Sequence, residues 1–164
     1  MPGCALTCPA YAAADHTQVD AAIARGEHLC TGLGWHLQQS PLLAAHRAPG
    51  AWLPVAERLA DWTRWSEAGD AIWALRGGFG AIELALAIGP SGPQPPELIG
   101  YSDITALHAL RHRRGLRGCY GPVAAQELGD TARSSLRAVL RAHRQAWDEL
   151  LCPDTVALHD GVAV

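Results

Sequence analysis

The segment Ala71 to Leu75 constrains the fold most, because it is an unbroken apolar run without polar alternation. A turn at Gly69 and Asp70 precedes it, and Gly77 and Gly78 follow it closely. A strand that shows no polar face is typical of a parallel sheet that helices cover on both sides. We therefore expect the chain to fold around a buried parallel sheet.

Strand-like and helix-like segments alternate along the rest of the chain. Short segments next to glycine or proline predict further strands over residues 4–8, 35–39, 98–101 and 118–120. Helical periodicity predicts helices over about 15–33, 55–67, 81–88, 103–113 and 130–150. This alternation is typical of βαβ units. We predict an α/β fold: an open, mainly parallel sheet with helices on both faces, in a Rossmann- or flavodoxin-like three-layer sandwich.

Tryptophans add to the predicted core. In the helix over 55–67, the spacing places Val55, Leu59, Trp62 and Trp65 on the buried side. Trp52 lies in the loop before that helix, where it could contact a substrate or another domain. Core or interface packing is the alternative role for Trp52, because tryptophan buries a large apolar area.

The composition excludes several classes of protein. Hydrophobic residues make up 49% of the 164 residues and charged residues 18%, which indicates a packed domain and excludes disorder. The cations are all arginine and are scattered, apart from those between Arg111 and Arg117, so no nucleic-acid surface is predicted. No apolar run approaches the ~20 residues of a membrane helix, and residues 1–8 lack a charged signal region. We expect a cytoplasmic protein.

Cysteine and histidine spacing predicts no metal site. The five cysteines form no CxxC pair, so a zinc site or a disulfide framework is not expected. His108 and His112 stand four residues apart, but no glutamate completes an HExxH pattern around them. We interpret both as solvated histidines on the surface of a helix. No metal and no cofactor is expected.

The first segment that could carry chemistry is the sequence RGGFG at residues 76–80, directly after the buried strand. Glycines permit close backbone approach, and the N-terminus of the next helix offers unpaired N–H groups. Such a turn can hold a carboxylate, a phosphate or a developing oxyanion. The alternative is a tight turn from strand to helix that binds nothing.

The second segment is GYSDIT at residues 100–105, where a strand ends and a helix begins at once. Ser102 occupies the bend, as the nucleophile does in a strand–turn–helix elbow. The alternative is that Ser102 caps the helix, which typically contributes about 1 kcal/mol. From Ser102 alone, the capping role is the more common one.

Together, the two segments resemble the LD-carboxypeptidase family of serine peptidases, which includes muramoyl-tetrapeptide carboxypeptidases and microcin C immunity peptidases. RGGFG, GYSDIT and the later GCYGPV at 118–123 resemble motifs of that family's N-terminal domain. The resemblance departs at Tyr120, where family members often have histidine. It covers nearly all of this chain but only about the first half of a usual family member.

The resemblance implies that Ser102 is the nucleophile and that the N–H groups of Gly78 and Asp103 form the oxyanion hole. It further implies release of a terminal D-amino acid from a murein peptide through an acyl-enzyme. An immunity-type amide hydrolase is equally permitted by these residues. The side chain of Asp103 is expected to point along its own helix start and to cap N–H groups there.

The family completes its triad with a glutamate and a histidine from a C-terminal domain. We expect residues 1–150 to form the nucleophile-bearing domain and 151–164 to begin a linker toward a second domain that is missing. The chain alone is then expected to be inactive, and a homodimer is one arrangement considered. Alternatives are an inactive remnant or binding domain, and one half of a split enzyme whose second chain supplies the base.

Overall fold

The centre of the molecule is a parallel sheet, seen in a computed structural model that describes residues 2–10, 16–45 and 53–142. Its five strands run in the order β2-β1-β3-β4-β5. This is the flavodoxin-like order of a doubly wound sheet. The strands are β1 (Gly3–Thr7), β2 (His36–Gln39), β3 (Ala71–Ala74), β4 (Glu97–Gly100) and β5 (Cys119–Tyr120).

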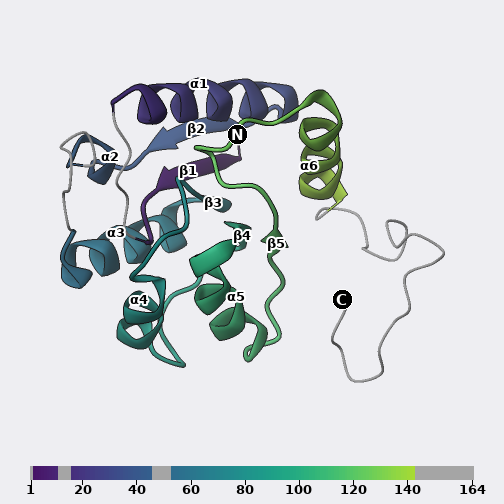
Figure 1. The fold of residues 1–164 in the computed structure, drawn as a ribbon. Helices are drawn as coiled ribbons and strands as arrows, with labels where there is room; N and C mark the ends of the chain where they lie inside the picture. The colour runs from purple at the N-terminus through teal and green to yellow at the C-terminus, as the bar shows by residue number, and fades with distance from the viewer. Residues whose placement is uncertain (1, 11–15, 46–52, 143–164) are drawn as a thin grey trace.

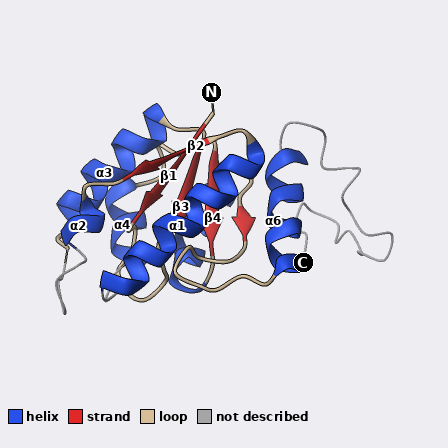
Figure 2. Ribbon diagram, turned by 90° about the horizontal axis from the view of Figure 1, so that it is seen from above, coloured by secondary structure: helices blue, strands red, loops and turns tan. Residues whose placement is uncertain are grey.

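Helices lie on both faces of this sheet (Figures 1 and 2). One face is covered by α1 (His16–Leu33) and α6 (Asp130–Ala142), and the other by α3 (Val55–Ala68), α4 (Ala81–Ile88) and α5 (Thr105–His112). A short 3-10 helix, η1 (Ser102–Ile104), leads into α5, and α2 (Leu42–Ala45) follows β2. The predicted three-layer α/β fold is confirmed.

Strand β3 accounts for the unbroken apolar run in the sequence. Ala71, Trp73 and Leu75 pack in the core under α1 and α6, while Ile72 and Ala74 pack in the core under α3, α4 and α5. All five residues are completely buried. Because β3 lies between β1 and β4 and has a helix layer on each side, neither of its faces tolerates a polar side chain.

Helix α3 differs from its prediction in the face that it buries. Trp62 and Trp65 are buried as predicted, but Val55 and Leu59 are only partly buried. Polar side chains take their place in the interior, namely Arg58 and Asp61. The cause is that this face of α3 also meets loop backbone at the carboxyl ends of the strands, where buried polar groups need hydrogen-bond partners.

Asp61 is one of these polar side chains. Its carboxylate accepts hydrogen bonds from Ser40 Oγ at 2.7 Å, from Trp65 Nε1 at 2.8 Å and from the hydroxyl of Thr7. Thr7 ends β1 and Ser40 follows β2. Asp61 therefore ties two strand ends to α3.

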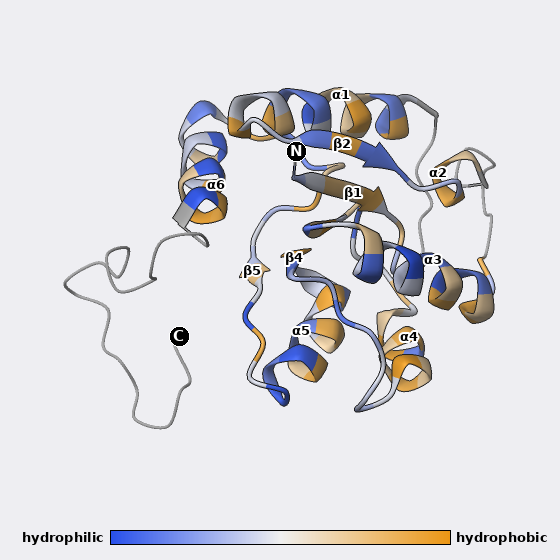
Figure 3. Cartoon of the chain, turned by 180° about the vertical axis from the view of Figure 1, so that it is seen from behind, coloured by the Kyte–Doolittle hydropathy of each residue, from blue (hydrophilic) through white to orange (hydrophobic). Residues whose placement is uncertain are grey.

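Two surface features complete the fold. Figure 3 shows the edge strand β2 as largely hydrophilic, whereas α4 is hydrophobic over most of its length.

Within the described ranges, no helix is long and apolar enough to cross a membrane. Trp52, proposed from the sequence as a contact residue, lies outside the described ranges.

Candidate active site

The turns after β3 and β4 meet at one rim of the sheet. The two strands are parallel neighbours, with Trp73 opposite Ile99, so their carboxyl ends point the same way. A Cβ atom built on Gly77 would lie 2.9 Å from Ser102 Cβ and 3.1 Å from Ser102 Oγ. Any side chain at position 77 would therefore collide with the serine. The two turns therefore lie in contact, as an oxyanion hole shared by Gly78 and Asp103 beside Ser102 would require.

Ser102 sits in a strained backbone conformation. Its φ is +64°, and among the described residues it is the one non-glycine residue with positive φ. Tyr101 before it is extended, and η1 begins at Ser102 itself. A left-handed conformation costs an L-residue about 1–2 kcal/mol. Such strain is common at functional sites, where the surrounding structure maintains it.

The Ser102 hydroxyl is exposed and does not cap the helix. No side-chain capping bond forms at the start of η1, and no described residue is a hydrogen-bond partner of Ser102 Oγ. Thr105 instead donates from its hydroxyl to the Ser102 carbonyl at 2.5 Å. This arrangement of strand, sharp bend and helix has the geometry of a nucleophile elbow.

The glycine turn after β3 also depends on positive φ angles. Gly78 has φ +124° and Gly80, which precedes α4, has φ +102°. Within the described ranges, the Gly78 N–H is paired with no acceptor. The first N–H groups of η1, including that of Asp103, also lack partners within that helix. Both N–H groups are thus available to a ligand at this rim.

The Asp103 carboxylate joins the two turns. Asp103 Oδ2 accepts a hydrogen bond of 2.7 Å from the backbone N–H of Ala81, the first residue of α4. The sequence analysis predicted that the Asp103 carboxylate would cap its own helix. That prediction is wrong, because the carboxylate caps α4 instead. The N-terminus of α4 lies beside η1, so the carboxylate satisfies an orphan N–H and the helix dipole there.

Arg58 holds the glycine turn from the opposite side. Its guanidinium, almost fully buried, donates to the carbonyls of Leu53 at 3.1 Å, Pro9 at 3.0 Å and Gly80 at 2.7 Å. It also pairs with Glu83 at 2.9 Å. Sequence analysis missed this residue. The available signal was an arginine placed on the same helical face as two core tryptophans.

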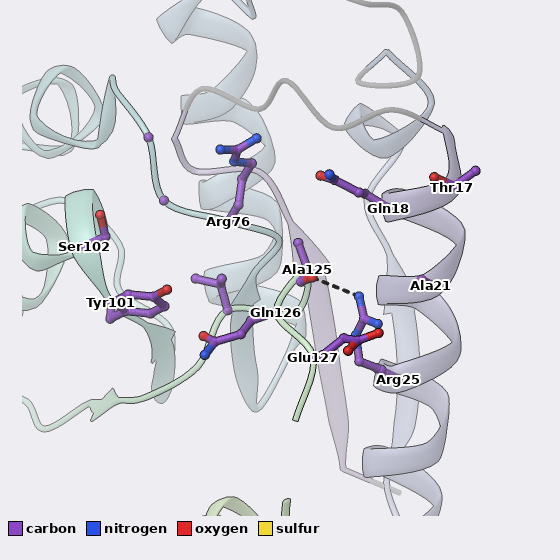
Figure 4. A pocket seen from close by; sticks show the side chains of 13 residues that line it. Thr17, Gln18, Ala21, Arg25, Arg76, Tyr101, Ser102, Ala125, Gln126 and Glu127 are labelled. Atoms are coloured by element: carbon purple, nitrogen blue, oxygen red, sulfur yellow. Dashed lines mark hydrogen bonds between the residues drawn. The ribbon is translucent and has the colours of Figure 1, made fainter. Parts of the chain in front are cut away.

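A cavity of about 660 Å³ opens beside Ser102 at this rim (Figure 4). One wall comes from the two turns, a second from the first turns of α1, and a third from the segment after β5. The lining residues are Arg76, Gly77, Gly78, Tyr101 and Ser102 from the turns, Thr17, Gln18, Ala21 and Arg25 from α1, and Val123, Ala125, Gln126 and Glu127 from the third wall.

The third wall is fixed by backbone pairing and by an arginine. The N–H groups of Ala124 and Ala125 donate to the carbonyls of Ala74 and Leu75, at 3.0 and 2.8 Å, so the segment is bound to the carboxyl end of β3. Arg25 of α1 donates from Nε to Ala124 O at 2.8 Å and from Nη2 to Ala125 O at 3.0 Å. Figure 4 shows the second of these bonds.

His108 and His112, on the helix after Ser102, do not line the cavity. His112 is exposed, as expected, but His108 is half-buried and donates from Nε2 to Gly100 O at 2.9 Å, so its prediction as a solvated residue is wrong. Burial lowers the pKa of His108, with a smaller contribution from the charge of Arg111. No histidine lines the cavity in the described part of the chain. There, no three His, Cys, Asp or Glu side chains gather as a metal site.

Comparison with known proteins relates this site to a peptidase family. A family model described as the LD-carboxypeptidase N-terminal domain matches residues 4–121. The murein tetrapeptide carboxypeptidase of Pseudomonas aeruginosa is 39% identical over 77 residues, which cover 43% of this chain and 24% of the relative.

Solved structures share the fold at lower identity. The microcin C7 self immunity protein MccF, in complex with aspartyl sulfamoyl adenosine, has a TM-score of 0.66 at 22% identity, covering 85% of this chain and 44% of that one. The MccF-like protein of Bacillus anthracis has a TM-score of 0.58 at 23% identity, with coverages of 76% and 38%. The MccF-like protein of Streptococcus pneumoniae, in complex with AMP, has a TM-score of 0.65 at 15% identity, with coverages of 85% and 45%.

The chain thus spans less than half the length of the solved structures, and its match to the curated relative covers about a quarter of that protein. The family model, in contrast, covers most of the chain and includes both turns of the site. The chain belongs to the LD-carboxypeptidase family, within the N-terminal domain of that family.

Proposed function

We propose that this chain is the nucleophile-bearing domain of a serine-type LD-carboxypeptidase that acts on murein-derived peptides in the cytoplasm, as part of peptidoglycan recycling. Ser102 is the proposed nucleophile, and the N–H groups of Gly78 and Asp103 form the proposed oxyanion hole. The observation that carries this proposal is the strained Ser102, whose side chain lies against Gly77 at the meeting point of the two turns. The family membership and the name of the curated relative support the substrate class.

The proposed reaction proceeds by acyl transfer. Ser102 Oγ attacks the carbonyl carbon before the terminal D-amino acid, and its proton passes to a base. The carbonyl oxygen becomes an oxyanion that accepts hydrogen bonds from Gly78 N–H and Asp103 N–H. The C–N bond then breaks, the base protonates the leaving amine, and water hydrolyses the ester on Ser102.

Among the described residues, no histidine lines the cavity to act as the base of this mechanism, and Glu127 lies beside Arg25, away from Ser102 (Figure 4). A serine hydroxyl is a poor nucleophile unless a positioned base removes its proton. The Nε2 of His108 is bonded to Gly100 O, away from the cavity lining. We propose that the base lies outside the described residues, in a second domain as the family resemblance implies, on the same chain or on a separate one.

Peptide binding tests the site without requiring the base. A synthetic murein tetrapeptide that ends in a D-amino acid is titrated into the ¹⁵N-labelled chain. The amide resonances of Gly78 and Asp103 are expected to shift on binding. Absence of binding, or shifts confined to a different surface, would overturn the proposed site.

Turnover tests the nucleophile. Release of the D-amino acid is followed by mass spectrometry for the chain alone and with the C-terminal domain of the Pseudomonas aeruginosa relative added. We expect no detectable release from the chain alone, and release with the added domain that Ser102→Ala abolishes and Ser91→Ala, at an exposed loop serine, does not. Release that persists in Ser102→Ala would overturn the nucleophile. Binding without release in any combination would favour a non-catalytic binding domain.

A further inference from the structure

Arg76 is the charged side chain of the two turns that lines the same cavity as the proposed nucleophile. It precedes Gly77, whose Cα region contacts Ser102. Figure 4 shows its guanidinium extending into the space between Ser102 and Gln18 of α1. The residue is half-buried, so solvent screens its charge less than that of a fully exposed arginine.

The other charged residues of the cavity lie toward α1. Arg25 is engaged with the carbonyls of Ala124 and Ala125, and Glu127 follows two residues after the second of these. Among the described lining residues, Arg25, Arg76 and Glu127 are the ones that carry charge. The Asp103 carboxylate belongs to the same turns, but it accepts from Ala81 N–H and does not line the cavity. The charge that the two turns contribute to the cavity lining is therefore positive and comes from Arg76.

Helix α1 reinforces this polarity. Its first turn contributes Thr17 and Gln18 to the wall that faces Arg76. The N-terminal end of a helix carries a partial positive charge, which favours an anion near it. Arg76 thus lies between Ser102 and the positive end of an 18-residue helix, which forms the opposite wall of the cavity.

We propose that Arg76 binds the terminal carboxylate of the peptide and so restricts the site to the last residue of a chain. This inference rests on the proposed role of Ser102. In a carboxypeptidase substrate, the attacked carbonyl and the terminal carboxylate are one residue apart, roughly 3.8 Å along the chain. A group that binds the carboxylate must therefore adjoin the nucleophile, as Arg76 does. A guanidinium suits this role, because its planar fork matches a carboxylate with two hydrogen bonds.

The test compares a peptide with its C-terminal amide. The tetrapeptide ending in a free D-amino acid and the same peptide as a carboxamide are titrated into the chain by calorimetry, and no turnover is required. The free acid is expected to bind about 10- to 100-fold more tightly, the range typical of hydrogen bonds to charged groups. Arg76→Gln is expected to remove this difference and to leave binding of the carboxamide within about twofold.

Two further variants keep the test decisive. Arg64→Gln removes an exposed arginine on α3 and is expected to retain the preference for the free acid. Arg76→Lys keeps the charge without the planar fork and is expected to weaken binding of the free acid alone, which separates recognition from a folding defect. The amide spectrum of each variant reports whether it is folded.

Each outcome bears on a separate claim. Equal binding of acid and amide, or a preference that survives in Arg76→Gln, overturns the role of Arg76 and leaves the proposed function in place. Binding of neither peptide overturns the proposed function, and the inference fails with it. A preference for the free acid that is lost in Arg76→Gln and kept in Arg64→Gln supports both the role of Arg76 and the proposed function.

Discussion

At the scale of single residues, the glycine turn is held between two charged side chains. Arg58 donates to the Gly80 carbonyl, and Asp103 accepts from the N–H of Ala81. The two bonds act on adjacent residues from opposite sides. They restrict where Gly78 can lie relative to Ser102, and an oxyanion site requires such restriction because its donors must be preorganised.

Glycine at position 80 is required for both its conformation and its close packing. Its φ is +102°, and an added Cβ would lie 2.9 Å from Arg58 Nη1. Gly80→Ala is expected to lose about 1–2 kcal/mol of unfolding free energy from the left-handed backbone and about 1–3 kcal/mol more from the displaced arginine. Urea denaturation measures the loss. Gly34→Ala is the control, because Gly34 has φ +71° with open space around it. Equal losses in both variants would contradict a special role for the Arg58 contact.

Glu97 is expected to make stability depend on pH. It is buried at the start of β4, where Oε1 accepts from the N–H groups of Cys119 at 2.8 Å and Leu98 at 3.2 Å. Burial raises its pKa to about 7, and the charge of Arg111 opposes this rise. The folded state therefore holds a proton that the unfolded state, with a pKa near 4.5, has released.

The sign of the effect follows from that difference. The stabilisation that Glu97 gains from its proton is complete below about pH 4.5 and is lost as the pH rises toward 7. The unfolding free energy should fall across this range in the native chain and change less in Glu97→Gln, which stays neutral. Chemical denaturation between pH 5 and pH 8 measures both. Parallel pH profiles for the two proteins would show that Glu97 does not titrate there.

Local and distant residues of the site differ in how far the sequence could predict them. The bends at Gly78 and Ser102 could be predicted, because glycines after a buried strand and a serine between a strand and a helix are local signals in the sequence. Their roles in the site stay predictions. The contacts of Arg58 and Arg25 could not be predicted, since all but the bond from Arg58 to Leu53 join residues 22 to 100 positions apart along the chain. The prediction for Asp103 was wrong for the same reason, because its carboxylate bonds to Ala81 of α4, 22 positions earlier, and not to an N–H of its own helix.

At the scale of elements, the segment after β5 is held against the carboxyl end of β3. Trp73 of β3 donates from Nε1 to Pro122 O at 2.7 Å, so the strand holds this segment by a side chain as well as by its backbone. The predicted strands and helices followed from hydrophobic pattern. The segment after β5 has no such hydrophobic pattern. Contacts with β3 and α1 fix its conformation, so the sequence alone does not predict it.

Arg25 is expected to maintain that third wall of the cavity. Arg25→Gln removes two hydrogen bonds to the carbonyls of Ala124 and Ala125. The amide protons of these two residues should exchange faster with solvent, because local opening becomes easier. Hydrogen exchange followed by NMR measures this. His28→Gln, one turn further along α1 at an exposed position, should leave both rates unchanged. Unchanged rates in Arg25→Gln would show that backbone pairing alone orders the segment.

At the scale of the whole molecule, the two helix layers differ in what they leave exposed. Leu136 and Leu140 of α6 are buried with α1 in one core, which closes that side of the sheet. On the other side, α4 buries Leu84 and Ile88 but presents apolar side chains outward as well. Figure 3 shows the result as a helix that is hydrophobic nearly all round. Helices with that pattern are usually covered on more than one side.

The outward face of α4 is therefore expected to cause self-association. Ile82 and Leu86 are 60% and 78% exposed, and their spacing of four residues places them along one stripe of α4. Phe79, in the turn before the helix, is 77% exposed. Sedimentation equilibrium should give an average mass above the 17.4 kDa of one chain as the concentration rises. Ile82→Gln combined with Leu86→Gln should restore the single-chain mass, whereas Leu116→Gln, on a different surface, should not. A native chain that remains monomeric at every concentration would show that the stripe is tolerated in water, and its apolar character would then need a cause other than contact between chains.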